Sequence, residues 1–552
     1  MNSPQKYIIQ DIRDFVPIWL RPWILISFLL VFQVSGGVYL ASANEMSSGL
    51  ALLNEDIMMA GYASLIGMLL VFVIMLRLKF RFSIKTSLLT CSLGVAICNI
   101  ICVNTTNVPL LVLVSFILGM FRMWGTFACN TTVQLWVTPK RDMAEWFCYI
   151  YLVVQACIQI SGLATTYTVF YTQWQYMHYL IIGASLLVFL LTKILFKHYR
   201  SMPKLPLFGI DWLGAILWCS AVMCAVFVLI YGDYYDWFYS DYIIAATVAC
   251  VVIVLLNVWR ASFIRHPFIN NCTWTYKNVY LTFFLYLGLD LLLSPSHLFE
   301  HIYTAAILHY DSLHIIALNW VVLLGIIIGA IFCYITFAKL RWKYKTMTII
   351  GLGFIVSYLV LMYFTIDYNQ TQESLFLPVL LRAFGYEIIA IVFLTALTVV
   401  PFPHFFQTIA IQGMVSACCG ALLGEAILHH FLDIVQKSNF SHFSSFIDGV
   451  GMQIYNFSEL YGTLQLHSLI VSMKEIYGFL SIVGILSFIA CLVYRSDLRT
   501  NTIFPKFKTI RKYFKKNTTE VNNKKWRLNF LVAILFLSLL GYLQYSKRNF
   551  FS

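Results

Sequence analysis

Five ionisable residues lie inside long apolar stretches of this chain. Arg122, Asp290 and Glu425 each stand alone in such a stretch, whereas Arg382 and Glu387 are five residues apart in another. Ionisable side chains within a membrane span are costly and by default mark a substrate or proton pathway. The alternative is a buried pair that only holds helices together. We expect function at Arg122 and Glu425 and leave both roles open for the other three.

The remaining titratable patterns give little support to an enzyme. His429, His430 and Asp433 form HHxxD, but the several His clusters of a membrane di-iron enzyme are missing. Glu300 and Asp433 lie near span ends, where we expect solvated or headgroup-level charges. The 14 Cys show no zinc-ligand spacing. No GxxxxGK[ST] loop occurs, so ATP is not the expected energy source. We therefore predict no catalytic residue, metal or cofactor.

The composition indicates that these residues are carried on membrane helices. Of 552 residues, 60% are hydrophobic and 11% charged, whereas soluble domains carry about 25% charged residues. Roughly 20 apolar residues span a bilayer as a helix. The chain contains fourteen such runs, the first at 22–42. We predict an all-α polytopic membrane protein with 14 transmembrane helices. A weaker run, 528–543, is either a fifteenth span or a helix lying on the membrane.

Lys and Arg are concentrated in alternate loops between the apolar runs. Loops after even-numbered runs are basic, as in RLKFRFSIK, whereas loops such as VNTTN and GDYYDWFYSD contain neither residue. Loops rich in Lys and Arg stay on the cytoplasmic side of a membrane. We therefore place the N-terminus in the cytoplasm and the chain in the inner membrane. The basic cytoplasmic loops of a protein in the lipid bilayer then account for much of the +13 charge, and no nucleic-acid partner is needed to explain it. Residues 1–21 look like an amphipathic interfacial helix, and 499–552 form a basic tail.

Several stretches, in order along the chain, resemble the 14-spanner drug:proton antiporter branch of the major facilitator superfamily. The fourth run, FILGMFRMWGTF, resembles the family's R-x-x-x-G motif at Arg122 and Gly125, and VTPKRDMAEWF resembles its next cytoplasmic turn. LRAFGYEIIAIVFLTALTVVP and IAIQGMVSACCGALLGEAIL resemble its twelfth and thirteenth spans. The resemblance implies six-helix bundles at 22–196 and 261–498 around a central substrate site, with two inserted helices in 197–260.

The chain also departs from the family's motifs. The loop after the second run keeps Arg81 but lacks the Gly and Asp of the family's G-x-L-x-D-R-x-G-R. The fifth run keeps Gly162 but lacks the following Pro of the antiporter motif. Small residues let membrane helices approach closely, and SACCGALLG carries Gly420 and Gly424. We regard Gly125 and these four residues as gating or packing candidates.

These patterns favour a secondary transporter that exports amphiphilic or drug-like molecules in exchange for protons. In this hypothesis a buried carboxylate of the C-terminal half takes up the proton, and Arg122 modulates it. Uptake by proton or ion symport is one alternative, and a non-transporting membrane enzyme or scaffold is another. An outer loop at 433–475 is expected, and a periplasmic adaptor protein is the partner we expect there.

Overall fold

The chain is almost entirely helical over the residues that the computed structural model describes. These residues are 9–36, 38–41, 43–199, 207, 209–368, 370–446 and 457–493. They include 13 helices long and apolar enough to cross a membrane, which confirms the expected all-α membrane fold. The first predicted span, 22–42, is shorter than expected: α1 (Arg21–Val34) has 14 residues and is followed by the short α2 (Val38–Ala41) and α3 (Ala43–Leu50). The tail 499–552, with its run at 528–543, lies outside the described residues.

The N-terminal bundle contains three helices, α5 (Ile84–Asn104), α6 (Val108–Val137) and α7 (Met143–Tyr171), that begin at polar capping residues, and its helices pack closely at glycines. The other helices of the bundle are α1, α4 (Asn54–Arg81) and α8 (Gln175–Leu195). Asp142 caps α7, accepting a hydrogen bond from the backbone N–H of Ala144 at 3.1 Å. A Cβ at Gly119 of α6 would overlap the backbone of Ser64 in α4, so small residues allow this close approach.

Two helices are inserted between the bundles. They are α9 (Trp212–Tyr231) and α10 (Asp241–Ala261), and α9 packs against both α4 and α17. Asp211, just before α9, pairs with Arg260 near the end of α10 through two contacts of 2.7 and 2.9 Å. The same carboxylate accepts from the backbone N–H of Phe268 at 3.1 Å. One carboxylate therefore ties both inserted helices to the start of the C-terminal bundle.

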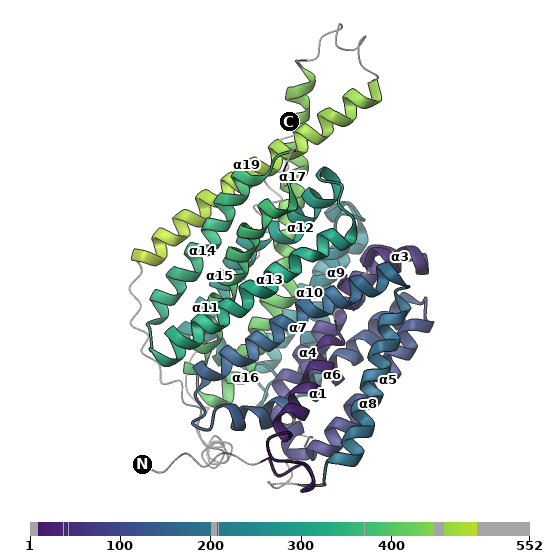
Figure 1. Ribbon diagram of the computed structural model, residues 1–552, viewed down its shortest axis with the longest axis vertical. Helices are drawn as coiled ribbons and strands as arrows, with labels where there is room; N and C mark the ends of the chain where they lie inside the picture. The colour runs from purple at the N-terminus through teal and green to yellow at the C-terminus, as the bar shows by residue number, and fades with distance from the viewer. Residues whose placement is uncertain are drawn as a thin grey trace.

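The C-terminal bundle contains several helices that continue through short π-helical turns. Its helices are α11 (Lys277–Leu293), α12 (Pro295–Ile302), α13 (Ser312–Cys333), α14 (Tyr344–Thr365), α15 (Phe376–Ala396), α16 (Phe402–Gly413), α17 (Ala421–Ser444) and α19 (Phe457–Val493). π-Helical turns follow α12, α13 and α16. In Figure 1 this bundle is green and lies above and to the left of the purple and blue N-terminal bundle. We call the end at which α4, α6, α8, α10 and α13 finish the basic end, because the basic loops follow these helices.

The expected loop at 433–475 is largely helical. Helix α17 extends to Ser444 and α19 begins at Phe457, and both project beyond the other helices at the top of Figure 1. The two helices support each other, since the Asn439 amide donates to the Ser472 hydroxyl at 3.0 Å and the rings of Phe440 and Tyr461 lie 5.4 Å apart. This mutual packing explains why a polar segment outside the apolar core remains helical.

The expected amphipathic helix within residues 1–21 is wrong over residues 9–20, which form an irregular N-terminal strap. Ile12 makes a β-bridge with Phe196, and the backbone N–H of Arg13 donates to Leu195 O at 2.8 Å. The buried Arg21 side chain donates to Ile9 O at 2.9 Å and to Val16 O at 3.1 Å. These carbonyls bind a side chain instead of helical N–H groups, so the strap fastens the N-terminus to the basic end.

Asp11 in the N-terminal strap makes the attachment of the strap sensitive to pH. Burial raises the pKa of its carboxyl to about 6, against the opposing effects of Lys79 and Lys197. Because the folded state binds the proton more tightly than the unfolded state, the contribution of Asp11 to stability decreases as pH rises from about 4 to 6. We expect Asp11→Asn to raise the thermal unfolding temperature at pH 7.5 and to leave it unchanged at pH 4. An equal shift at both values would show that the carboxyl does not titrate there.

Candidate functional site

A carboxyl group without a partner lies where the two bundles meet. Glu387, near the middle of α15, is fully buried, and neither of its carboxylate oxygens has a hydrogen-bond partner among the described residues. A Cβ at Gly329 of α13 would lie 3.0 Å from Glu387 Cβ, so the side chain is held against α13. Burying an ionised, unpaired carboxylate costs several kcal/mol. The side chain is therefore best accommodated here in its protonated form.

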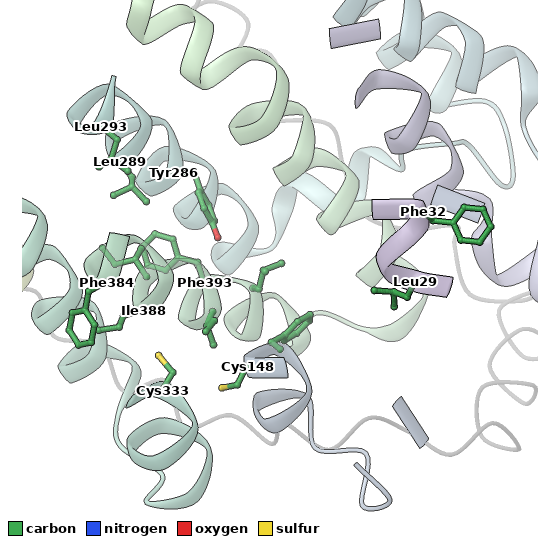
Figure 2. Packing of buried hydrophobic residues seen from close by; sticks show 14 of the residues in the cluster. Leu29, Phe32, Cys148, Tyr286, Leu289, Leu293, Cys333, Phe384, Ile388 and Phe393 are labelled. Carbon is green, nitrogen blue, oxygen red and sulfur yellow. The ribbon is translucent and has the colours of Figure 1, made fainter. Parts of the chain in front are cut away.

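The surroundings of Glu387 come from both bundles. Cys148 and Tyr151 of α7 and Cys333 of α13 lie within electrostatic range of its carboxylate. Figure 2 shows Cys148 and Cys333 beside one another, close to Ile388 of α15. The hydroxyls of Tyr151 and Tyr386 are 3.3 Å apart across the same boundary. Separation of α7 from α13 and α15 would therefore bring water to Glu387.

Asp290 and Glu425 lie on α11 and α17 of the C-terminal bundle, and Asp290 is within electrostatic range of Tyr386, the residue before Glu387. Asp290 of α11 is buried, and one of its oxygens has no hydrogen-bond partner. A Cβ at Gly420 would overlap that oxygen, and a Cβ at Gly424 would lie 2.7 Å from Ser294 Cβ. Both glycines thus let α17 and the turn before it approach α11. Glu425 is only partly buried, within electrostatic range of Tyr62 on α4.

Among the described residues, Arg122 forms no ion pair with a carboxylate. Its guanidinium donates to Phe32 O at 3.3 Å, to Gln33 O at 3.2 Å and to the Ser64 hydroxyl at 3.0 Å. A Cβ at Gly36 would overlap the guanidinium. In this conformation Arg122 therefore fastens the end of α1 to α4 and α6. Any modulation of a carboxylate of the C-terminal half requires another conformation and stays a prediction.

Arg382 and Glu387 share α15 but are not brought together. Arg382 pairs instead with Glu300 of α12, with an N–O distance of 2.7 Å, and Glu300 also accepts from the Tyr358 hydroxyl at 2.8 Å. The expected headgroup-level charge at Glu300 is thus wrong, since Glu300 is only 8% exposed. The sequence places Glu300 at the end of an apolar run. The π-helical turn after α12 extends this span to Ile307, and that extension could not be read from composition.

The Glu300–Arg382 pair leads to a stability prediction. Removing one partner of a buried pair leaves an uncompensated charge and typically costs about 3–5 kcal/mol. We expect Arg382→Gln to lower the thermal unfolding temperature strongly, and the double variant Glu300→Gln/Arg382→Gln to recover much of the loss. Detergent-solubilised protein and a thermal unfolding assay suffice. If the single and double variants were equally destabilised, the two side chains would not act as a pair.

The two bundles are linked at the basic end by ion pairs that the sequence analysis did not foresee. Lys339 Nζ lies 2.8 Å from Glu145 Oε1, and Arg341 pairs with Asp142. Asp142 and Glu145 are at the start of α7, whereas Lys339 and Arg341 are at and just beyond the turn that ends α13. We call these four residues the basic-end latch. The gating candidate Arg81 is the last residue of α4, and its role in gating stays a prediction.

The remaining glycine candidates lie at helix contacts. A Cβ at Gly125 of α6 would lie 2.7 Å from the ring of Phe32 on α1, and Figure 2 shows this ring on its helix. A Cβ at Gly162 of α7 would lie 3.3 Å from the Asn319 amide nitrogen of α13. Gly162 therefore lies at the boundary between the bundles, towards the end of α7 opposite the basic-end latch. In the described part of the chain, no three His, Cys, Asp or Glu residues are grouped to hold a metal ion.

Comparison with solved structures identifies the fold. A mutant of the peptide transporter POT in complex with alafosfalin is similar over 86% of this chain and 95% of its own, with a TM-score of 0.52 and 15% identity. The same mutant in complex with sulfate has a TM-score of 0.52 and 16% identity over 87% of this chain and 96% of its own. The likeness to a mutant of the nucleoside transporter NupG is weaker, with a TM-score of 0.47 and 14% identity over 85% and 99%. No protein-family model and no curated protein matches the sequence.

The chain therefore has the major facilitator fold that the resemblance implied. At this level of identity the likeness concerns the fold alone, and function has to be argued from the site.

Proposed function

We propose that this protein is a secondary active transporter that exports amphiphilic small molecules in exchange for protons. One observation carries the proposal: Glu387 is fully buried between the bundles, and within the described part of the chain both of its carboxylate oxygens lack a hydrogen-bond partner. Burial of such an ionisable group is costly in free energy, and by default it marks a functional site. A carboxyl that is protonated when enclosed and loses its proton when wetted provides that function.

The coupling step follows from the geometry. We call the arrangement in which α7 packs against α13 and α15 the closed arrangement. In it Glu387 keeps its proton, because an ionised carboxylate there would have neither water nor a partner. When α7 separates from α13 and α15, water reaches the carboxyl and the proton leaves. The affinity of Glu387 for a proton then differs between conformations, and such differential binding is what allows a proton gradient to drive a conformational cycle.

The substrate class is inferred from the residues at the bundle boundary. Tyr151 and Tyr386 face each other there, and the rings of Tyr149 and Tyr334 lie 5.5 Å apart nearer the basic end. Aromatic rings with hydroxyl groups offer apolar contact together with hydrogen bonding. This combination suits amphiphilic molecules better than small ions.

The proposal is tested with purified protein in liposomes that contain a pH-sensitive dye. A panel of amphiphiles and dyes is added after a pH gradient is imposed. We expect at least one compound to dissipate the gradient faster than in protein-free liposomes. Proton movement with the compound instead of against it would establish symport and overturn export. No response from folded protein to any compound would remove proton-coupled transport of this substrate class.

We further propose that the projecting ends of α17 and α19 contact a periplasmic adaptor protein. The support is their extension beyond the other helices and their mutual packing through Asn439 and Phe440. Photocrosslinkers placed at the exposed Ile434 and Tyr461 would be expected to capture one defined partner in intact cells. Crosslinking only to lipid would argue against an adaptor.

A further inference from the structure

A surface groove of about 580 Å³ runs between α14 and α19. It is lined by Ile349, Ile350, Gly353, Phe354, Val356, Ser357, Ile485 and Phe488. The Ser357 hydroxyl donates to Gly353 O at 2.8 Å, so the one polar side chain in the lining is already satisfied. The groove exists partly because residue 353 has no side chain: a Cβ there would lie 3.3 Å from the Phe488 ring.

The groove belongs to one bundle and is separate from the candidate transport site. Helix α14 packs against α15 and α19, whereas α7 of the other bundle packs against α13 and α15. Rocking of the bundles would therefore leave the groove unchanged. Its lining forms part of two apolar helices with membrane-spanning length, α14 and α19. An occupant would accordingly reach it from within the bilayer.

Two lysines at the start of α14 precede the lining residues on the side of the basic end, and we call this position the cationic mouth of the groove. Lys343 is exposed immediately before α14, and residues 343, 346, 350, 353 and 357 follow the spacing of one helix face. Lys345 Nζ donates to Leu492 O at 2.7 Å and so bridges the ends of α14 and α19. At 1.5 Å per residue, the lining of α14 then extends about 12 Å from Ile349 to Ser357.

We propose that this groove binds one anionic phospholipid of the leaflet at the basic end. The phosphate lies at Lys343 and Lys345, and one acyl chain lies along the apolar lining between α14 and α19. A cationic mouth at headgroup level with an apolar channel behind it matches both parts of such a lipid. Basic pockets between membrane helices recognise anionic headgroups in this way.

The test compares lipid binding by native mass spectrometry of the full-length chain in mild detergent. Phosphatidylglycerol and phosphatidylcholine with identical acyl chains are titrated separately. The double variant Lys343→Gln/Lys345→Gln is expected to lose phosphatidylglycerol affinity about fivefold for each lysine, with phosphatidylcholine unaffected. Lys140→Gln, an exposed lysine in the loop between α6 and α7, is the matched control and should behave as the parent protein.

A second pair of variants tests the acyl-chain site independently. Gly353→Leu is expected to fill the groove and to weaken binding of both lipids, with Ser357→Leu as an alternative if the first does not fold. Gly183→Leu on the surface of α8, where a Cβ would meet nothing within 4 Å, should bind both lipids normally. Equal affinity of the parent protein for the two lipids would overturn the proposal. So would unchanged binding in the lysine or groove variants, or a groove that takes up no lipid because another segment or a second copy covers it.

Discussion

Replacement of Glu387 by glutamine is expected to abolish proton-driven transport while substrate exchange in the absence of a gradient persists. Glutamine has the size and neutral charge of the protonated glutamic acid, so the closed arrangement at α7, α13 and α15 is retained. It cannot take up and release a proton, so the conformational cycle loses its link to the gradient. The measurement is gradient-driven proton movement in liposomes, compared with counterflow of labelled substrate. Proton movement should fall to the level of protein-free liposomes.

Three further replacements give this result its meaning. Glu373→Gln changes an exposed residue in the segment before α15 and should leave transport intact. Asp290→Asn and Glu425→Gln remove the other two carboxyl candidates. Our assignment requires Glu387→Gln to reduce gradient-driven proton movement more than Asp290→Asn or Glu425→Gln does. Full gradient-driven transport in Glu387→Gln would move the proton site to Asp290 or Glu425.

Disruption of the basic-end latch is expected to expose the buried cysteines beneath it. Cys148 is one helical turn beyond Glu145, and Cys333 precedes the turn that carries Lys339. Both thiols are buried in the closed arrangement. Arg341→Gln is expected to raise their alkylation rates about tenfold or more, because a hydrogen bond to a charged group contributes about 1.5–3 kcal/mol. Mass spectrometry of N-ethylmaleimide-treated protein reports each site separately.

The second pair of the latch should have a smaller effect. The side chain of Glu145 is 22% exposed, against 6% for Asp142, and exposed ion pairs contribute about 0.2–1 kcal/mol. Lys339→Glu should therefore raise the alkylation rates only a few-fold, and the swap Glu145→Lys/Lys339→Glu should restore them. Lys140→Gln removes a nearby charge outside the latch and serves as the control. Alkylation rates that do not respond to Arg341→Gln would show that these pairs do not hold the bundles closed.

Together, the two predictions connect the charges in this protein to one movement. Opening at the basic end separates α7 from α13, and the same separation would wet Glu387. The latch residues lie at the start of α7 and at the turn that ends α13, and Glu387 of α15, the proposed proton carrier, lies against α13 at a different depth. A proton gradient could therefore act on the contact between α7 and α13 directly, without a long path through the protein.

The sequence determined the class of fold because lipid imposes simple rules. In hydrocarbon every backbone N–H and C=O must be satisfied within its own segment, so long apolar runs become helices whatever surrounds them. The length of the apolar runs was therefore sufficient to predict the membrane helices between 54 and 493. The same rules could not foresee the N-terminal strap, since its carbonyls are satisfied by Arg21 and by the chain after α8.

The sequence also located the ionisable residues but not their partners. Composition alone singled out Arg122, Arg382 and Glu387, because an ionisable side chain inside any apolar membrane span is costly in free energy. Their pairing depends on which helix faces meet. In the structure Arg382 pairs with Glu300, and Arg122 donates to carbonyls at the end of α1. Among the described residues, the Glu387 carboxylate between the bundles has no hydrogen-bond partner. Only tertiary packing could decide this, because contacts between residues up to 90 positions apart are not encoded in any local pattern.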